Sequence, residues 1–355
     1  MKMAAAAAAP AGLLLALVLA PLAIIAQQPR SLPASNLPVP TADVSPRLQE
    51  NVAHPLAAPF PEPHSSEDWK KLAAMRDAAR VEGLPELLKS LRVAMKPATI
   101  GGVKTYAITP EQIAPENRRR LLVHVHGGAY VFYGGESGTR EAILMAHYGK
   151  IKVISVDYRM PPDHPFPAAI DDTVAVWKEA IKTTPPSSIG LFGTSTGGGL
   201  TLATVLRLKQ LKLPLPGAIG PGTPWSDLTK TGDSYFTNAN IDNVLIDYER
   251  LLGPCARLYA NGHDLKDPLL SPVYGDFHGF PPTILLSGTR DLFLSNTVRV
   301  HRKLRRAGVI ADLHVFEAQS HGQYMLDQID SEESRETFTE LSLFFNRYLR
   351  RVAAR

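Results

Sequence analysis

A serine within a glycine-rich pentapeptide is the first residue of this chain that could act as a nucleophile. Ser195 is the central residue of Gly193–Gly197, whose sequence Gly-Thr-Ser-Thr-Gly fits the pattern Gly-x-Ser-x-Gly. This pattern can expose a serine hydroxyl on a sharp turn between a strand and a helix, although it also occurs by chance as an ordinary turn. An apolar run, 189–192, precedes it and a run of helical pattern, 200–211, follows it, which favours the catalytic interpretation.

A serine hydroxyl needs a base to remove its proton, and the base needs a carboxylate to orient it. Asp291 follows an apolar run and a glycine-containing turn, and His321 follows the next apolar run. Because the carboxyl ends of parallel strands meet at one edge of a sheet, these loops would bring Ser195, Asp291 and His321 together. We therefore predict that these three residues form a Ser-His-Asp catalytic triad. Glu317 is the alternative carboxylate, although it is expected to end a strand rather than to lie in the loop.

Two glycines after an earlier apolar run could stabilise the negative charge that develops on a reacting carbonyl oxygen. Gly127 and Gly128 follow His126, and backbone N–H groups without a side chain beside them can approach such an oxygen closely. We predict that the N–H groups of Gly127, Gly128 and Thr196 form an oxyanion hole, with that of Ala129 as an alternative donor. His126 itself is expected to brace the loop. An ordinary tight turn is the alternative reading of the glycines.

These loops must be positioned by a set of alternating strands and helices. Strand-like apolar runs alternate with amphipathic helical segments after residue 101, which predicts an α/β fold with a mostly parallel sheet and helices on both faces. The expected strands are 120–126, 152–156, 188–193, 218–220, 283–287 and 312–317, and the expected helices are 168–183, 198–212, 296–307 and 332–350.

Two segments lie outside this alternation and are expected to form a cap. Residues 46 to about 96 gradually acquire a helical spacing of apolar residues, and the polar stretch from about 227 to 268 has a helical patch near 243–252. The predicted organisation is a signal peptide at 1–26, a flexible linker at 27–45, N-terminal cap helices at 46–100 and a catalytic domain at 101–350 that includes the cap insertion at about 227–268.

The first residues of the chain have the pattern of a secretory signal. Lys2 gives a positive start, an apolar run extends from Ala4 to Ala26, and small residues precede a polar stretch. We expect cleavage after Ala26 and a periplasmic or secreted protein of bacterial origin, with any membrane contact limited to this leader. A retained membrane anchor is the alternative, because the run is nearly long enough to cross a bilayer, but Pro21 interrupts it.

The composition excludes several other classes of protein. With 355 residues, of which 45% are hydrophobic and 20% charged, the chain can bury a large core, so global disorder is excluded. The net charge of +4 is mild and the basic residues are scattered, so no nucleic-acid partner is expected. The single cysteine, Cys255, excludes an intramolecular disulfide and is expected to be a buried or half-buried thiol. The sequence contains no metal-ligand cluster, dinucleotide fingerprint or Gly-Lys-Ser/Thr motif, so neither metal nor cofactor is expected.

Over about residues 100–350 the motifs resemble those of the hormone-sensitive-lipase-like carboxylesterases, the alpha/beta hydrolase fold-3 group. The sequence His-Gly-Gly-Ala-Tyr at 126–130 resembles that family's signature His-Gly-Gly-Gly-aromatic. Residues 157–169 resemble its stretch Asp-Tyr-Arg-Leu-Ala-Pro-Glu-His-Pro-Phe-Pro-Ala-Ala, and 224–228 also have a counterpart. The pentapeptide around the serine is closer to the subgroup with Gly-Thr-Ser-Ala-Gly than to the commoner Gly-Asp-Ser-Ala-Gly.

The resemblance implies an α/β-hydrolase fold with an eight-stranded sheet, a helical cap, and hydrolysis of short- to medium-chain acyl esters without a cofactor. We expect a small-molecule ester to lie under the cap against Tyr130 and Trp225 and to react through an acyl-enzyme. Thr196 is bulkier than the alanine of the subgroup, which bears on the size of the acyl pocket. The same apparatus could open a lactone or cleave an amide, and the chain is expected to be a monomer or homodimer. A non-catalytic receptor with a degraded triad is the remaining alternative, but all three positions are filled here.

Overall fold

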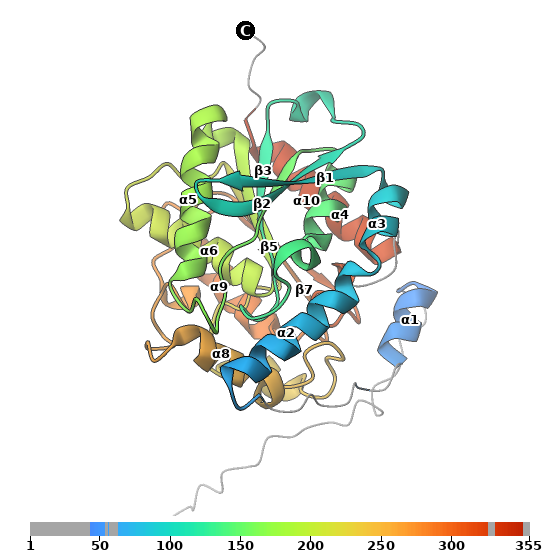
Figure 1. Cartoon of the computed structure of the whole chain (residues 1–355), viewed down its shortest axis with the longest axis vertical. Coiled ribbons are helices and arrows are strands. Elements are labelled where there is room, and N and C mark those ends of the chain that lie inside the picture. Colours follow the sequence, from blue (N-terminus) through green and yellow to red (C-terminus); the bar gives the residue numbers. More distant parts are fainter. Residues whose placement is uncertain (1–42, 54–55, 57–62, 326–330, 351–355) are drawn as a thin grey trace, which may run out of the picture. The chain divides into compact units, whose positions relative to one another are not determined.

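Eight strands form one sheet at the centre of the described part of the chain, which comprises residues 43–53, 56, 63–325 and 331–350 of a computed structural model (Figure 1). The predicted signal peptide, 1–26, lies outside the described residues. The strands are β1 (Val93–Ile100), β2 (Val103–Pro110), β3 (Leu121–Val125), β4 (Val153–Val156), β5 (Ile189–Thr194), β6 (Ala218–Gly222), β7 (Thr283–Gly288) and β8 (Ala311–Phe316).

The order of the strands in the sheet is β1-β2-β4-β3-β5-β6-β7-β8. The β1–β2 and β2–β4 pairs are antiparallel, and every other neighbouring pair is parallel. All strands from β3 to β8 therefore end at the same edge of the sheet, which is where ligands bind in folds of this kind. The predicted fold class, a mostly parallel α/β-hydrolase sheet of eight strands, is confirmed.

The two antiparallel strands are absent from the sequence-based prediction. The six predicted strands are present, each within two residues of its expected ends, but residues 93–100 form β1 instead of the predicted cap helix. β1 is an edge strand in which only Val93 is buried, so its sequence has neither an apolar run nor a regular alternation. Pro97 is compatible with a strand at this position because an edge strand does not need every N–H group.

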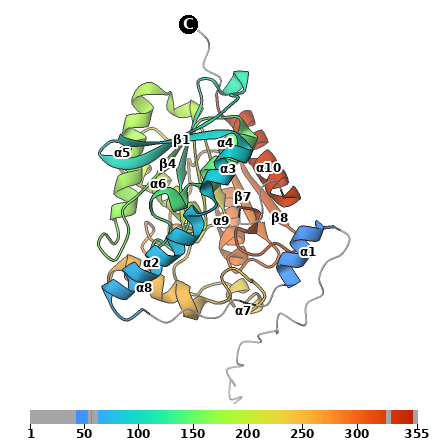
Figure 2. The same ribbon diagram turned by 45° about the vertical axis from the view of Figure 1, so that its right-hand side comes forward.

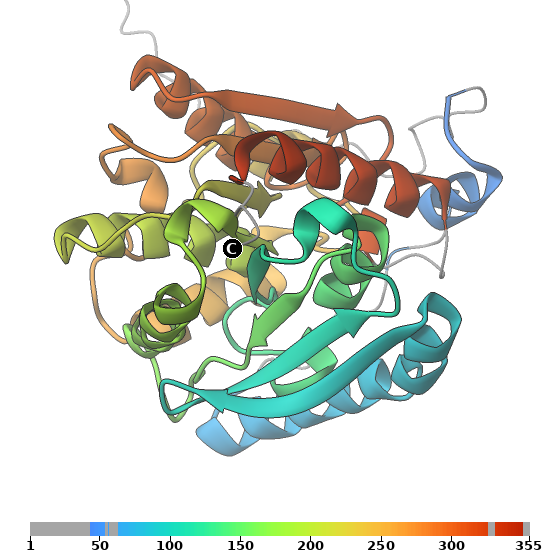
Figure 3. The ribbon, with the colours of Figure 1, turned by 90° about the horizontal axis from the view of Figure 1, so that it is seen from above.

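Helices cover both faces of the sheet and create two hydrophobic cores (Figure 3). In β5, for example, Leu191 packs into one core and Phe192 into the other. Because both faces of the central strands are buried, these strands have continuous apolar runs, which made them predictable. One face is covered by α5 (Ala168–Thr183), α6 (Thr196–Gln210) and α9 (Leu294–Arg306), and the other by α3 (Leu84–Leu91), α4 (Arg140–Gly149) and α10 (Glu332–Tyr348).

The remaining helices come from the N-terminal segment and from the insertion between β6 and β7, apart from short 3-10 turns. Both views of the ribbon place α2 beside α8 (Figures 1 and 2). Among the described residues, no helix combines the length and the apolar character needed to cross a bilayer. The helices are α1 (Pro46–Ala53), α2 (Ser66–Val81), α7 (Ser234–Thr237), the π-helical η5 (Tyr248–Leu252) and α8 (Gly253–Ala260), and the 3-10 turns are η2 (Pro115–Asn117), η3 (Gly135–Gly138), η4 (Pro186–Ser188), η6 (Pro272–Tyr274) and η7 (Gln323–Met325).

The helix in the insertion starts later than the predicted patch at 243–252. It begins at Tyr248 and continues through α8. Asp247 caps it, since its side chain accepts a hydrogen bond of 2.9 Å from the N–H group of Arg250. The preceding residues form turns instead, because the carboxylate of Asp242 accepts hydrogen bonds from the backbone of Val244 and Leu245.

Candidate active site

Ser195 lies at the turn between β5 and α6 in a backbone conformation that non-glycine residues rarely adopt. Its φ is 66° and its ψ is −124°, a geometry that persists only where the surroundings fix it. Its N–H group donates to the carbonyl of Gly222 at 2.9 Å. The flanking glycines allow β3 to pass close by, because a Cβ atom on Gly193 or Gly197 would lie 2.0 or 2.1 Å from the carbonyl oxygen of Val125. Close packing against β3 therefore explains both glycines of the pentapeptide.

Asp291 and His321 approach each other from the loops that follow β7 and β8. His321 Nδ1 lies 3.0 Å from Asp291 Oδ1, and both side chains are buried. The carboxylate also accepts hydrogen bonds from the hydroxyl of Ser287 at 2.7 Å and from the N–H group of Phe293 at 2.9 Å. The ring of Phe293 meets the imidazole edge-on, with 4.7 Å between the centroids. The imidazole is therefore held with Nδ1 toward the carboxylate.

The second imidazole nitrogen faces no protein partner. Among the described residues, His321 Nε2 is buried and makes no hydrogen bond. His321 and Ser195 line the same cavity. A carboxylate at Nδ1 accepts the proton there and leaves Nε2 as a lone-pair acceptor, which is the state that a general base requires. The rival carboxylate Glu317 is exposed, and no hydrogen bond within the described residues joins it to His321.

The loop after β3 supplies the two predicted glycines to this cavity. Gly127 and Gly128 both line it. Gly128 has a φ of +118°, and a Cβ atom there would lie 2.2 Å from the carbonyl oxygen of Phe132, so the position requires glycine. Among the described residues, the N–H groups of Gly127, Gly128 and Thr196 donate no hydrogen bond to the protein. These three groups can therefore bind an oxygen atom of a ligand.

His126 braces this loop from within the protein. Its Nδ1 lies 2.7 Å from the carbonyl oxygen of Gly127, and its ring stacks on Tyr158 at 4.1 Å between centroids. The hydroxyl of Tyr158 donates to the carbonyl oxygen of His126 at 2.8 Å. Burial lowers the pKa of His126 to about 3, so the imidazole is neutral at physiological pH. These contacts suit the bracing position expected from the sequence.

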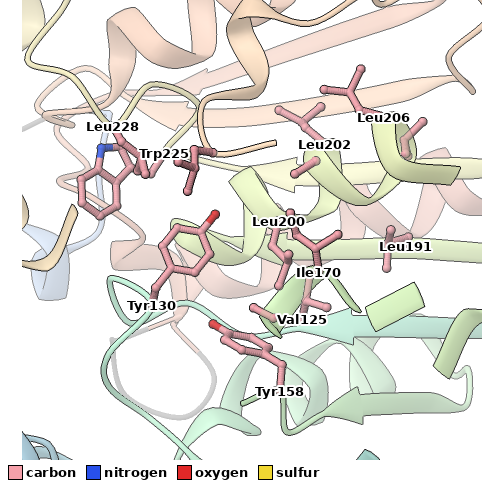
Figure 4. Packing of buried hydrophobic residues seen from close by; sticks show 14 of the residues in the cluster. Val125, Tyr130, Tyr158, Ile170, Leu191, Leu200, Leu202, Leu206, Trp225 and Leu228 are labelled. Atoms are coloured by element: carbon pink, nitrogen blue, oxygen red, sulfur yellow. The ribbon is translucent and has the colours of Figure 1, made fainter. Parts of the chain in front are cut away.

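The prediction that Tyr130 and Trp225 line the substrate pocket is wrong. Both side chains belong to the core beside α6 (Figure 4), and neither lines the cavity. Tyr130 stacks on Tyr259 with 3.8 Å between centroids, and Trp225 stacks on Phe293 with 5.5 Å. The two aromatic residues therefore support the loops of the site from behind.

The walls of the cavity come largely from residues that sequence reasoning did not identify. α2 supplies Arg76 and Arg80, and the loop after β3 supplies Tyr133. The guanidinium of Arg80 lies 3.7 Å above the ring of Tyr133, and Arg76 donates to the Tyr133 hydroxyl at 3.0 Å. The apolar part of the wall consists of Ala129, Phe132, Val244, Leu245, Ile246, Leu251, Leu252 and Met325.

A buried polar network supports the turn of Ser195 and was also missed. The carboxylate of Glu141 accepts hydrogen bonds from the N–H group of Thr194 at 3.1 Å and from its hydroxyl at 2.6 Å. His124 Nε2 lies 3.1 Å from the same carboxylate. Glu141 belongs to α4, whose apolar sequence has little helical periodicity, so no signal in the chain connects it with the pentapeptide. The network fixes the residue that precedes Ser195.

Comparisons with known proteins agree with this fold. Residues 122–325 match the family model described as alpha/beta hydrolase fold. An acetyl-hydrolase of Streptomyces hygroscopicus is 31% identical over 202 residues, which cover 56% of this chain and 67% of that protein. An esterase of Acinetobacter venetianus is 32% identical over 220 residues, which cover 61% of this chain and 70% of that protein.

Solved structures give the same result over more of the chain. The crystal structure of an esterase named E25 is 44% identical, covers 91% of this chain and 98% of that one, and has a TM-score of 0.84. An esterase from the bacterial hormone-sensitive lipase family is 27% identical, covers 86% of this chain and 99% of that one, and has a TM-score of 0.74.

The chain belongs to the α/β-hydrolase fold family. Within this family it is a hormone-sensitive-lipase-like carboxylesterase, that is, a carboxylic ester hydrolase. The resemblance drawn from the motifs is thereby confirmed.

Proposed function

We propose that this enzyme hydrolyses short- to medium-chain acyl esters through an acyl-enzyme formed on Ser195. The observation that carries the proposal is the imidazole of His321, whose Nδ1 lies 3.0 Å from Asp291 while its buried Nε2 has no partner among the described residues. Because Ser195 lines the same cavity, the hydroxyl and the imidazole can act on one bound ester.

The reaction would proceed in two acyl transfers. His321 removes the hydroxyl proton of Ser195 as its oxygen attacks the ester carbonyl, and the N–H groups of Gly127, Gly128 and Thr196 stabilise the oxyanion. The carbon–oxygen bond to the alcohol then breaks, and His321 gives its proton to the leaving oxygen. A water molecule attacks the acyl-enzyme in the same way, which releases the acid and restores Ser195.

The chemistry of the cavity supports an acyl substrate. Its wall is largely apolar on the side of Val244–Ile246, where an alkyl chain would lose contact with water. The wall includes residues from both α2 and the insertion, so an acyl chain under the cap would contact both segments.

The proposal can be tested with p-nitrophenyl esters of increasing acyl length. We expect the wild type to have its highest activity at short chains, and Ser195→Ala to lose nearly all activity with every ester. Labelling of the wild type, but not of Ser195→Ala, by a serine-directed organophosphate is the matched measurement. If Ser195→Ala retained activity, Ser195 would not be the nucleophile. Lactones and amides in the same panel identify the preferred bond.

We also propose that the enzyme is exported. The proposal rests on the apolar run Ala4–Ala26 with Lys2 before it. Cleavage after Ala26 would leave a linker to residue 45, the cap helices and the catalytic domain. The mass of the protein recovered from a bacterial periplasm or culture medium tests the cleavage, and recovery of the uncleaved chain in membranes would favour an anchor instead.

A further inference from the structure

A fully buried carboxylate from the insertion lies between the loops of Asp291 and His321. Asp242 Oδ2 accepts hydrogen bonds from the N–H group of Leu292 at 2.8 Å and from that of His321 at 3.3 Å. Leu292 immediately follows Asp291 in the chain. One oxygen atom of Asp242 therefore joins the backbones that carry both residues.

The other oxygen of the same carboxylate holds the wall of the cavity. Asp242 Oδ1 accepts from the N–H groups of Val244 at 2.9 Å and Leu245 at 3.0 Å. The side chains of Val244, Leu245 and Ile246 line the cavity. Since the two oxygens are bonded to the same carbon, a displacement of this wall moves the point to which both loops are bonded.

Neighbouring residues of the insertion reinforce this connection. The side-chain amide of Asn238 donates to the carbonyl oxygen of Asp291 at 2.9 Å. The N–H group of Asn243 donates to the hydroxyl of Ser320, next to His321, at 3.3 Å. The segment 238–246 is thus bonded to both loops at several points, and Asp242 is the only one of these three residues that carries a charge.

The charge of Asp242 is retained at an energetic cost. Burial, and next the nearby carboxylate of Asp291, raise the pKa of Asp242 to about 6, whereas His321 acts in the opposite direction. Asp291 and His321 are the titratable groups beside it. At neutral pH Asp242 therefore carries a second negative charge within hydrogen-bond distance of the backbone of His321, and this charge favours the protonated state that the imidazole enters during each acyl transfer.

We propose that Asp242 is a positioning residue that fixes the loops of Asp291 and His321 relative to the acyl wall and stabilises the imidazolium through its charge. This inference rests on the proposed function, because it assigns Asp242 a place in the same reaction. It differs from a purely structural role in predicting a change in the pH dependence of the reaction as well as in its rate.

The test uses Asp242→Asn with p-nitrophenyl butyrate over a range of pH. Asparagine has one acceptor oxygen, so its amide group would face two N–H donors and the loops would shift. We expect kcat to fall by about tenfold or more, because small displacements of catalytic groups have large effects on rate, and KM to change by less than about threefold. The acid limb of the kcat/KM profile should move to lower pH, since the imidazolium loses a neighbouring negative charge.

Asp267→Asn is the matched control. Asp267 lies in the same insertion and accepts from the N–H group of Leu269 at 2.8 Å, and within the described residues it neither lines the cavity nor bonds to the loops of Asp291 and His321. This variant should keep the wild-type kcat and the wild-type acid limb. A folded Asp242→Asn variant with wild-type kcat and an unmoved acid limb would overturn the inference.

Asp242→Glu separates the charge from the geometry and also decides the question if Asp242→Asn does not fold. It keeps the charge but displaces it by one methylene, so kcat should fall while the acid limb stays at the wild-type pH. Wild-type kcat in Asp242→Glu would contradict the positioning role. Failure of the underlying proposed function would appear elsewhere, as activity in Ser195→Ala, so the two failures are distinguishable.

Discussion

At the scale of single residues, the hydrogen bond from His321 to Asp291 determines which imidazole nitrogen can accept a proton. The carboxylate has three partners, and Nε2 has none among the described residues. The tautomer of His321 therefore depends on a hydrogen-bond acceptor at Nδ1, and not only on the negative charge of Asp291. An amide in place of the carboxylate would reverse this arrangement.

Asp291→Asn should consequently abolish most activity without unfolding the protein. The asparagine amide can present an N–H group to Nδ1, which stabilises the tautomer with its proton on Nε2 and removes the base. We expect kcat to fall by about 10⁴-fold, because a Ser-His-Asp triad in which this carboxylate becomes an amide holds the wrong tautomer of the base. Steady-state kinetics with a neutral aryl ester, together with circular dichroism, measure the effect. Activity within tenfold of the wild type would point to another orienting group.

The residues of the site differ in how far the sequence could predict them. Asp291 and His321 follow the neighbouring parallel strands β7 and β8, so the parallel order of the strands alone brings them to one edge. Tyr130 was misplaced because its φ is 63° and that of Ala129 is 54°, which redirects the side chain into the core. Asp242 has no motif, because its role depends on contacts with residues 50 and 79 positions away in the chain.

At the scale of elements, the close approach of β3, β5 and α6 holds the turn of Ser195. This approach depends on glycines, whose missing side chains leave room for the carbonyl oxygen of Val125. The same close approach of β3, β5 and α6 allows α6 to begin directly after Ser195. The elements that sequence analysis missed lack such signals, since β1 is exposed and α4 is apolar on most sides.

Gly197→Ala should therefore destabilise the protein, whereas Gly83→Ala should not. The added methyl group at Gly197 would lie 2.1 Å from the carbonyl oxygen of Val125, but a methyl group at Gly83 would meet nothing within 4 Å. We expect a loss of about 1–3 kcal/mol in the free energy of unfolding for Gly197→Ala, as for other overpacked positions. Urea denaturation of both variants compares them directly. Equal free energies of unfolding for the two variants would show that the turn of Ser195 can relax around the added methyl group.

At the scale of the whole described structure, a hydrophobic core packs on each face of the sheet, and the insertion between β6 and β7 contributes part of the cavity wall. The cores were predictable from apolar runs because these reflect burial on both faces. The predicted cap could be recognised in the sequence only as a pair of segments outside the alternation. The cavity is lined by residues from α2 and from the insertion that are far apart in the sequence, and no local sequence pattern indicates that they would line one cavity.

The buried carboxylate of Asp242 should make the stability of the protein depend on pH. Its pKa is raised to about 6, above the ordinary value of 3.8, mainly by burial. A raised pKa contributes stability that is fully present below the unfolded value and is lost as the pH rises through the folded value. The free energy of unfolding of the wild type should therefore decrease relative to that of Asp242→Asn between about pH 4 and about pH 7. Urea denaturation at intervals of pH measures this difference, and a constant difference would contradict the assignment.

The attachment of segment 238–246 to both loops has a consequence for chimeric enzymes. A designer who wishes to change acyl preference would naturally exchange the lining residues Val244–Leu252 with those of a relative. A splice made between Asp242 and Val244 would separate the carboxylate from the turn that it closes. Crossovers placed before Asn238 would transplant the pocket wall together with its anchor, and such hybrids should retain turnover more often than those joined inside the turn.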